Sequence, residues 1–404
     1  MGVTVKTTSP AKSSVAVSPA KFVAENGKLN ADALVNLDHG DPTMFVPYWQ
    51  KMSEGSTITF PGSQSLSYFS ETKSVCWFLE PKLEAEIRRL HRIVRNATVG
   101  EEDCIVVGSG SSQLIQAALY ALSPPDPDQP ISVVCAAPYY SSYPEIANLL
   151  RSRSYKWGGD ARNFDKEEAY IELVTTPNNP DGAIREPVVN RPQGKVIYDF
   201  AYYWPHYTAI SSAPSHDLML FTFSKCTGHA GSRIGWAIVR NKEVAKKMTK
   251  FIEVSTIGVS KDSQLRAAKI LGVVSDSCFS GDDFFTYSRN ILKERWQRLR
   301  QVVKGSDLFH VQKYPILYCH FAKSMTETLP AFAWMKTIKG EVDCVDLLKE
   351  HKILARIGTR FGVESNFARI SMVSKDEEFN TFLRKLSIIQ GRDDPIDDEN
   401  HTHI

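Results

Sequence analysis

The chain has 404 residues, of which 42% are hydrophobic and 23% are charged, and its formal net charge at pH 7 is +2. This length is enough for two or three domains, and the composition is that of an ordinary globular protein. The balanced charge gives no reason to expect a nucleic acid or an acidic membrane surface as a partner. No apolar run approaches the length of about 20 residues that a membrane-spanning helix needs.

The seven cysteines are widely scattered, they form no CxxC pair, and their number is odd. Such a pattern is typical of a reducing compartment, and it predicts neither a disulfide framework nor a zinc site. His401 and His403 lie in a polar stretch and are expected to be solvated rather than bound to a metal. We therefore expect a cytoplasmic protein that binds no metal.

The two ends of the chain differ in composition from the rest. Residues 1–30 are rich in Ser, Ala, Lys and Thr and lack the apolar core of a secretory signal. They are predicted to be a disordered leader, with a plastid transit peptide as the alternative because acidic residues are few there. Residues 391–404 are polar and acidic and are predicted to be a disordered tail.

Between residues 61 and 310, apolar runs typical of strands alternate with stretches typical of helices. This alternation predicts a mostly parallel sheet covered by helices, the large domain of an α/β protein. Residues 31–60 and 311–390 are predicted to form a smaller α+β domain. Ligands of parallel sheets bind outside the carboxyl ends of the strands, so motifs that directly follow the strands should meet in one cleft. The strands are expected at Cys104–Val107, Ile131–Ala136, Ile171–Thr175, Lys195–Asp199 and Leu218–Phe223.

The first motif, Gly108–Ser112, follows the first of these strands and precedes a predicted helix, Gln113–Leu122. Its backbone N–H groups and the hydroxyls of Ser111 and Ser112 can bind an anion at the positive end of that helix. The motif completes neither a Walker loop nor a dinucleotide fingerprint. On its own, a plain strand-to-helix turn is an equally good interpretation.

Two polar motifs follow later strands. The loop Thr176–Gly182 holds paired asparagines between prolines, and Asn179 is a candidate hydrogen-bond partner for an oxygen on a cofactor ring. A tight surface turn is the alternative interpretation of this loop. Asp199 ends the next strand, where its carboxylate can pair with a pyridine nitrogen, and Tyr202 follows within reach of a ring hydroxyl. An isolated aspartate at a strand end is often only a helix cap.

The most informative motif is Phe221–Lys225, in which an apolar run leads to a lysine beside two small hydroxyl residues, Thr222 and Ser224. Glycines follow, and then Arg233. This arrangement is typical of a lysine that forms a Schiff base with pyridoxal phosphate, since hydroxyls and a guanidinium can hold the cofactor phosphate. The amine must be unprotonated to react, and an enclosed site favours loss of the proton. A surface lysine at a strand end, the alternative, would account neither for Arg233 nor for the upstream motifs.

Arg369 lies in a short apolar run of the predicted small domain. A guanidinium can bind a carboxylate through two parallel hydrogen bonds, so Arg369 is a candidate ligand for the carboxylate of a substrate. From the residues alone, a surface salt bridge is the preferred interpretation.

Longer stretches of the chain resemble one known family. From about Val35 to Leu386 the chain resembles the plant tryptophan aminotransferase family of auxin synthesis, which is related to alliinases and belongs to the fold-type I pyridoxal phosphate enzymes. The resemblance implies a large domain with a mostly parallel sheet, a smaller α+β domain and pyridoxal 5'-phosphate as cofactor. The stretches that carry it are Asn36–Thr43, Ser67–Ser70, Cys76–Pro81, Asp199–Tyr207 and Lys225–Trp236.

The resemblance also implies a role for each candidate residue. Lys225 would form the Schiff base and then move the substrate proton. Asp199 would pair with the pyridine nitrogen, and Arg369 would bind the substrate carboxylate with Gly40 nearby. Tyr68 would reach the cofactor phosphate of a neighbouring subunit, which implies a homodimer with shared active sites. The ring oxygen would be contacted by Asn179 and Tyr202, and the phosphate by Ser111, Ser112, Thr222, Ser224 and Arg233.

The function implied by the resemblance is transamination of L-tryptophan, or of other aromatic amino acids, to indole-3-pyruvate, with pyruvate or another 2-oxo acid as acceptor. Trp77, Phe78 and Tyr203 are candidates for the slot that an indole needs. One alternative is a C–S lyase that acts on S-alkyl cysteine sulfoxides, as alliinases do. It is disfavoured because the first cysteine is Cys76, so no cysteine-rich module precedes the catalytic region. A non-catalytic cofactor-binding protein and a nicotinamide dehydrogenase are further alternatives, disfavoured by Lys225 and by the incomplete glycine fingerprint.

Overall fold

The structure is a computed structural model that describes residues 33–70, 74–338 and 342–391. The predicted leader (residues 1–30) and residues 392–404 of the predicted tail lie outside these ranges. Within them, no helix has both the length and the apolar character needed to cross a membrane.

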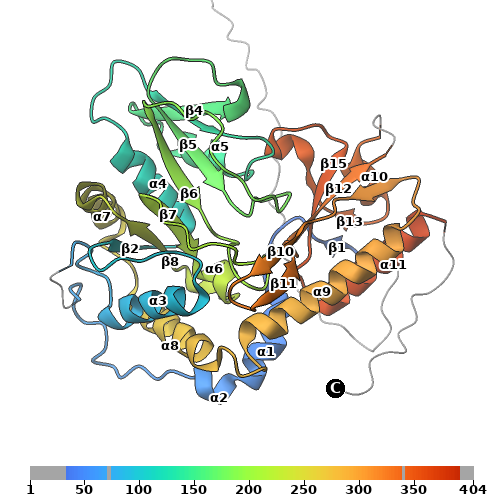
Figure 1. The fold of residues 1–404 in the computed structure, drawn as a ribbon, viewed down its shortest axis with the longest axis horizontal. Helices are drawn as coiled ribbons and strands as arrows, with labels where there is room; N and C mark the ends of the chain where they lie inside the picture. The colour runs from blue at the N-terminus through green and yellow to red at the C-terminus, as the bar shows by residue number, and fades with distance from the viewer. Residues whose placement is uncertain (1–32, 71–73, 339–341, 392–404) are drawn as a thin grey trace, which may run out of the picture.

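A seven-stranded sheet forms the centre of the larger part of the molecule (Figure 1). Its strand order is β2-β8-β7-β6-β5-β3-β4, and the pairs from β7 to β4 are all parallel. β8 runs antiparallel to both of its neighbours, so the prediction of a mostly parallel sheet is confirmed. The strands are β2 (Cys104–Gly108), β3 (Ile131–Cys135), β4 (Tyr155–Asp160), β5 (Tyr170–Thr175), β6 (Gly194–Asp199), β7 (Leu218–Thr222) and β8 (Gly235–Val239).

Helices surround this sheet. Their sequences show why: in α3, Leu83, Ile87, Leu90 and Val94 recur every three or four residues and form one fully buried face. α3 packs against α8, and α4 packs against α7. The strands β3, β5, β7 and β8 are buried along their whole length, which explains their near-continuous apolar runs. The helices are α3 (Pro81–Val94), α4 (Ser111–Leu122), α5 (Tyr143–Leu149), α6 (Phe223–Cys226), α7 (Lys242–Thr256) and α8 (Lys261–Ser277), with the 3-10 turns η2 (Ala161–Asn163) and η3 (Ala230–Ser232).

A four-stranded antiparallel sheet, in the order β14-β15-β12-β9, forms the centre of the smaller part. β1 pairs in parallel with β13, which joins the first described residues to the C-terminal third of the chain. The elements are β1 (Val35–Asn36), β9 (Phe309–Val311), β12 (Phe332–Thr337), β13 (Ile353–Leu354), β14 (Arg356–Ile357), β15 (Phe367–Ser371), α10 (Cys344–Glu350), α11 (Asp376–Ile389) and the 3-10 turn η4 (Gly358–Phe361).

The remaining elements link the two parts. The long helix α9 (Phe284–Val303) contacts β9 and α11 of the smaller part, and its Phe285 stacks on Trp204 of the larger part. The short helix α2 (Ser53–Ser56) contacts α8. The predicted domain boundaries, at residues 60 and 310, remain a prediction, and the boundary at 310 falls inside β9. The other elements are η1 (Thr43–Phe45), α1 (Val46–Lys51), β10 (Ile316–Cys319) and β11 (Ser324–Glu327), of which the last two form an antiparallel hairpin.

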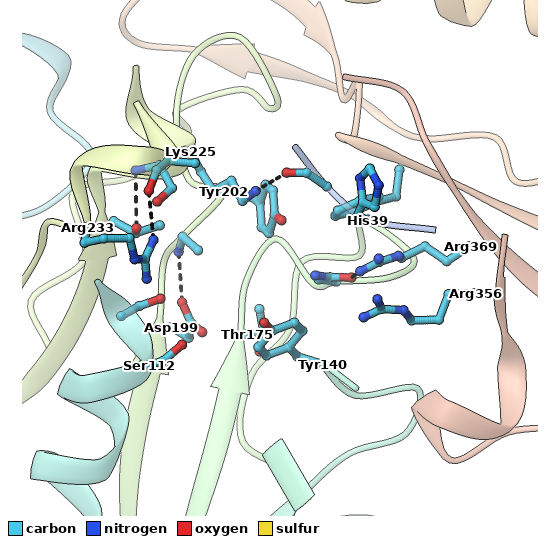
Figure 2. Close-up of a pocket in the computed structure, with 18 residues that line it drawn as sticks. His39, Ser112, Tyr140, Thr175, Asp199, Tyr202, Lys225, Arg233, Arg356 and Arg369 are labelled. Carbon is cyan, nitrogen blue, oxygen red and sulfur yellow. Dashed lines mark hydrogen bonds between the residues drawn. The ribbon is translucent and has the colours of Figure 1, made fainter. Parts of the chain in front are cut away.

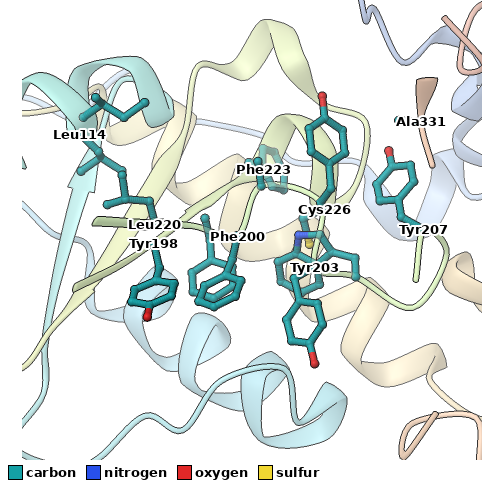
Figure 3. Packing of buried hydrophobic residues seen from close by; sticks show 14 of the residues in the cluster. Leu114, Tyr198, Phe200, Tyr203, Tyr207, Leu220, Phe223, Cys226 and Ala331 are labelled. Atoms are coloured by element: carbon teal, nitrogen blue, oxygen red, sulfur yellow. The ribbon is translucent and has the colours of Figure 1, made fainter. Parts of the chain in front are cut away.

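The core continues directly beneath the short helix α6 (Figure 3). Phe223 and Cys226 are fully buried there, and their spacing of three residues places them on one face of the helical turn. Phe221, at the end of β7, stacks on Trp236 of β8 with ring centroids 6.0 Å apart. The turn that carries Lys225 is therefore attached to the core on both sides of the lysine.

Candidate active site

A cavity of about 330 Å³ lies where the ends of the strands of the large sheet face the small sheet (Figure 2). Thr175 ends β5, Asp199 ends β6 and Thr222 ends β7, so three parallel strands deliver polar side chains to one edge. The expectation that the motifs meet in one cleft is met. The lining residues are His39, Gly40, Ser111, Ser112, Tyr140, Thr175, Asn179, Asp199, Ala201, Tyr202, Thr222, Ser224, Lys225, Ala230, Arg233, Phe332, Arg356 and Arg369.

Tyr68 is the one predicted site residue that does not line this cavity. Tyr68 is 67% exposed, and Leu66 and Phe69 close to it in the chain are also exposed. The predicted role of Tyr68 concerns a neighbouring subunit, so its position in a single chain leaves that role a prediction. The candidates for an indole slot, Trp77, Phe78 and Tyr203, also lie away from the lining. The aromatic residues that do line the cavity are Tyr140, Tyr202 and Phe332.

Lys225 points into the cavity from α6, whose first turn is capped by the hydroxyl of Thr222, which accepts from the backbone N–H of Ser224 at 3.3 Å. The Nζ of Lys225 donates to the backbone carbonyl of Gly40 at 2.6 Å. Burial lowers the pKa of Lys225 to about 8, and the positive charges of Arg369 and Arg233 act in the same direction, whereas Asp41 opposes them. Near physiological pH the neutral form of this amine is therefore far more populated than that of an exposed lysine.

Two side chains, one buried and one partly buried, hydrogen-bond to the backbone of this turn. His206 shares a hydrogen bond between its Nε2 and the Lys225 carbonyl at 3.2 Å, and Trp49 donates from Nε1 to the Thr227 carbonyl at 2.9 Å. Burial lowers the pKa of His206 to about 3, so its ring is neutral and Nε2 carries the donated proton. These two donors bind backbone carbonyls at the lysine and two residues after it, and so help to fix the direction of the lysine. Sequence analysis gave neither residue a role, although a histidine within the apolar run before Tyr207 is a signal of buried hydrogen bonding.

A site that can bind an anion lies at the start of α4. Gly110 has a φ of +79°, and a Cβ at this position would overlap the guanidinium of Arg233. Gly235 is equally constrained, since a Cβ there would lie 2.9 Å from the backbone nitrogen of Ser111. Glycine at both positions lets the guanidinium approach the N-terminus of the helix, where the hydroxyls of Ser111 and Ser112 face the cavity.

Asp199 is buried and carries two hydrogen bonds. Its Oδ2 accepts from the hydroxyl of Tyr143 at 2.8 Å, and its Oδ1 accepts from the backbone N–H of Ala201 at 3.1 Å. Burial raises the pKa of Asp199, and both hydrogen bonds oppose that shift. Tyr143, the first residue of α5, also lies 2.5 Å from the hydroxyl of Thr175. Sequence analysis missed Tyr143 because the contact with Asp199 spans 56 residues of chain.

Arg369 is 2% exposed, so the surface salt bridge preferred from the residues alone is wrong. Its Nη1 donates to Oδ1 of Asn179 at 3.1 Å and its Nη2 to the backbone carbonyl of Asp38 at 2.5 Å. Its Nε has no partner among the residues that the structure describes. Burial, with the nearby charge of Arg356, lowers the pKa of Arg369 to about 10. A buried guanidinium held only by neutral acceptors is a binding site for a carboxylate.

The cavity thus combines an amine of lowered pKa, a buried carboxylate, aromatic walls and two places for anions. A phosphorylated aromatic aldehyde and an amino acid together present the complementary groups. Residues that sequence analysis did not single out are His39, Tyr140, Thr175, Phe332 and Arg356.

The lowered pKa of Lys225 leads to a first prediction. In the protein without cofactor, acylation of Lys225 should reach half its maximal rate near pH 8 rather than near the ordinary lysine value of 10.5, because burial favours the neutral, reactive amine. Pulse acylation at a series of pH values, read by peptide mass spectrometry, measures this midpoint. Asp41→Asn should lower the midpoint further, since it removes a negative charge that favours the ammonium. A midpoint close to 10.5 would contradict the prediction.

Comparison with known proteins agrees with the resemblance. A family profile described as Allinase matches residues 35–390. Tryptophan aminotransferase-related protein 2 of Arabidopsis thaliana is 53% identical over 359 residues, which cover 88% of this chain and 81% of that protein. Tryptophan aminotransferase-related protein 1 of Oryza sativa subsp. japonica is 49% identical, with 91% and 86% covered. An alliin lyase of Allium cepa var. aggregatum is 35% identical, with 87% and 80% covered.

Solved structures give the fold. An aspartate aminotransferase of Thermus thermophilus, a single mutant, superposes with a TM-score of 0.62 at 18% identity and covers 88% of this chain and 91% of its own. The substrate-bound BacF structure from Bacillus subtilis superposes with a TM-score of 0.64 at 18% identity, with 90% and 91% covered. The predicted fold-type I architecture is confirmed. The chain therefore belongs to the alliinase family of pyridoxal phosphate-dependent enzymes, together with the tryptophan aminotransferase-related proteins.

Proposed function

We propose that the protein is an aminotransferase that converts L-tryptophan, or another aromatic amino acid, to the corresponding 2-oxo acid, which is indole-3-pyruvate for tryptophan. Pyruvate or another 2-oxo acid accepts the amino group, and the reaction serves auxin biosynthesis. The observation that carries this proposal is that Lys225, whose amine has a lowered pKa, and the buried guanidinium of Arg369 line the same cavity. The names of the relatives that are 53% and 49% identical support the choice of tryptophan.

The lining of the cavity fits pyridoxal 5'-phosphate. The approach of Arg233 to Gly110 at the start of α4 provides a place for the phosphate, with hydroxyls from two serines, Thr222 and Ser224 around it. Asp199, which is buried and accepts two hydrogen bonds, would hold a protonated pyridine nitrogen. A hydrogen bond joins Tyr202 to Asn179, and both would contact the ring oxygen. When bound, this cofactor supplies an electron sink for the bond that loses its proton.

The protein's own residues would then move one proton. Arg369 binds the α-carboxylate of the amino acid through its fork and so fixes the position of the α-carbon. Lys225, whose pKa is about 8, removes the α-proton in its neutral form and carries it as an ammonium. The Gly40 carbonyl, which accepts from Nζ at 2.6 Å, helps to orient the lysine for both steps.

The proposal includes a homodimer with shared active sites in the cytoplasm. Leu66, Tyr68 and Phe69 expose 82%, 67% and 68% of their surface, an apolar run that a second subunit would cover. In such a dimer the hydroxyl of Tyr68 would reach the phosphate in the neighbouring cavity.

A second candidate function is a C–S lyase. The family membership and the 35% identity with an alliin lyase favour it, and the same lysine could remove the α-proton of a cysteine sulfoxide. The two reactions differ in products, because elimination yields an alkylsulfenic acid, pyruvate and ammonia, whereas transamination of tryptophan yields indole-3-pyruvate. A non-catalytic role is disfavoured by the lowered pKa of Lys225.

The first test of this function supplies purified protein and pyridoxal 5'-phosphate with tryptophan and pyruvate, and separately with an S-alkyl cysteine sulfoxide. Indole-3-pyruvate and alanine should form in the first mixture. Lys225→Ala should lower the rate by at least about a hundredfold, because it removes the group that moves the proton. Lys247→Ala, a change on the exposed side of α7, is the control and should leave the rate unchanged. Formation of pyruvate and ammonia from the sulfoxide alone would instead establish the lyase.

A second test concerns the support of Asp199. Tyr143→Phe removes the hydroxyl that donates to Oδ2 at 2.8 Å, and it should lower kcat/KM about tenfold, since a hydrogen bond to a charged group contributes roughly 1.5–3 kcal/mol. Asp199→Asn should have a larger effect, because a neutral amide cannot hold the pyridine nitrogen protonated. Steady-state kinetics with tryptophan measures both variants, and an unchanged kcat/KM in Tyr143→Phe would refute the role of this contact.

A further inference from the structure

The cavity holds a second arginine beside Arg369. Arg356 of β14 and Arg369 of β15 are direct partners in the register of the small sheet, and both line the cavity (Figure 2). Two adjacent guanidiniums could in principle bind two carboxylates. A substrate with a carboxylate at each end would then bind as well as one with a single carboxylate.

The partners of the two arginines differ in charge. Arg356 donates from Nε to Oδ1 of Asp38 at 2.6 Å and from Nη2 to Oδ2 of the same carboxylate at 3.3 Å, and its Nη1 donates to the hydroxyl of Ser141 at 3.1 Å. Arg369 contacts Asp38 only through the backbone carbonyl. Asp38 therefore contacts both arginines, but its carboxylate forms hydrogen bonds and an ion pair with Arg356 alone.

Asp38 is suited to remain ionised in this position. Burial alone would raise the pKa of Asp38, but the hydrogen bond and charge of Arg356, with the charge of Arg369, lower it below its ordinary value. The two parallel hydrogen bonds to Arg356 have the geometry in which arginine and carboxylate pair most strongly. The guanidinium of Arg356 is thus already paired with the carboxylate of Asp38.

We propose that the Asp38–Arg356 ion pair restricts the site to amino acids and 2-oxo acids with a single carboxylate. This inference rests on the proposed aminotransferase function, for which Asp38 would be the residue that selects the substrates. A second carboxylate on the substrate would meet an arginine that is already paired and an aspartate that repels it. Neutral side chains would meet Phe332 and Tyr140 on the same lining. The amino acceptor is accordingly a 2-oxo acid with a neutral side chain.

Asp38→Asn tests the proposal, because it removes the negative charge at nearly constant size. The measured quantity is the ratio of kcat/KM for 2-oxoglutarate to kcat/KM for pyruvate, with one aromatic donor. This ratio should be low in the unmodified protein and rise about tenfold or more in Asp38→Asn, as expected when a charge-assisted contact becomes available to the substrate. Arg356→Gln is the matched control, and it should lower the ratio because it leaves Asp38 unpaired.

If the charge of Asp38 selects the substrate, the ratio of the two kcat/KM values rises in Asp38→Asn and falls in Arg356→Gln. A general disturbance of the site would not change the ratio in opposite directions. An unchanged ratio in Asp38→Asn, in a variant that still transaminates, would overturn the inference and leave the proposed function intact. If the unmodified protein transaminates no amino acid, the proposed function fails. The inference about Asp38 is then tested separately, by measuring the binding of carboxylates. Calorimetry should then show that Asp38→Asn binds maleate about tenfold more tightly than the unmodified protein does. The affinity for 3-phenylpropionate, which has one carboxylate, should be the same in both proteins. Equal binding of maleate by both proteins would refute the proposal.

Discussion

The site depends on the removal of one lysine amine from water beside other positive charges. Lys225 loses the solvation that would favour its ammonium form, and Arg369 and Arg233 lower its pKa further, to about 8. The same excess of positive charge serves anionic ligands, since a phosphate and a carboxylate are the groups that such a cavity attracts. The positive charges that attract the ligands therefore also help to lower the pKa of the lysine. Asp38 reduces this excess most directly beside Arg356, with which its carboxylate forms an ion pair.

This environment arises from segments that are far apart in the chain. The amine of Lys225 meets the carbonyl of Gly40 across 185 residues, and Arg356 meets Asp38 across 318. The pairing of β1 with β13 brings the residues after β1 to the small sheet, and the carboxyl ends of β5, β6 and β7 supply the opposite wall. Neither sheet alone could form the cavity. The fully buried Phe223 and Cys226 then fix α6 so that the lysine faces the space between the sheets.

Much of this arrangement could be predicted from the sequence. Apolar runs that end in polar residues identified the strands of the large sheet, and the rule that ligands bind at their carboxyl ends placed Asp199 and Lys225 in one cleft. What could not be predicted are contacts that depend on tertiary packing. Tyr143 meets Asp199 because α5 begins beside the end of β6, and no local pattern specifies that approach. The local sequence of Arg369 by itself favours a surface salt bridge, and only the family resemblance indicates a substrate ligand, since burial of an arginine is decided by the residues around it in the fold.

One measurement tests the central claim most directly. Borohydride reduction of the protein loaded with pyridoxal 5'-phosphate, followed by peptide mass mapping, identifies the side chain to which the cofactor aldehyde is joined. The account predicts a phosphopyridoxyl group on the peptide that contains Lys225. Recovery of that peptide without the added mass, in protein that is folded and has bound the cofactor, would contradict it.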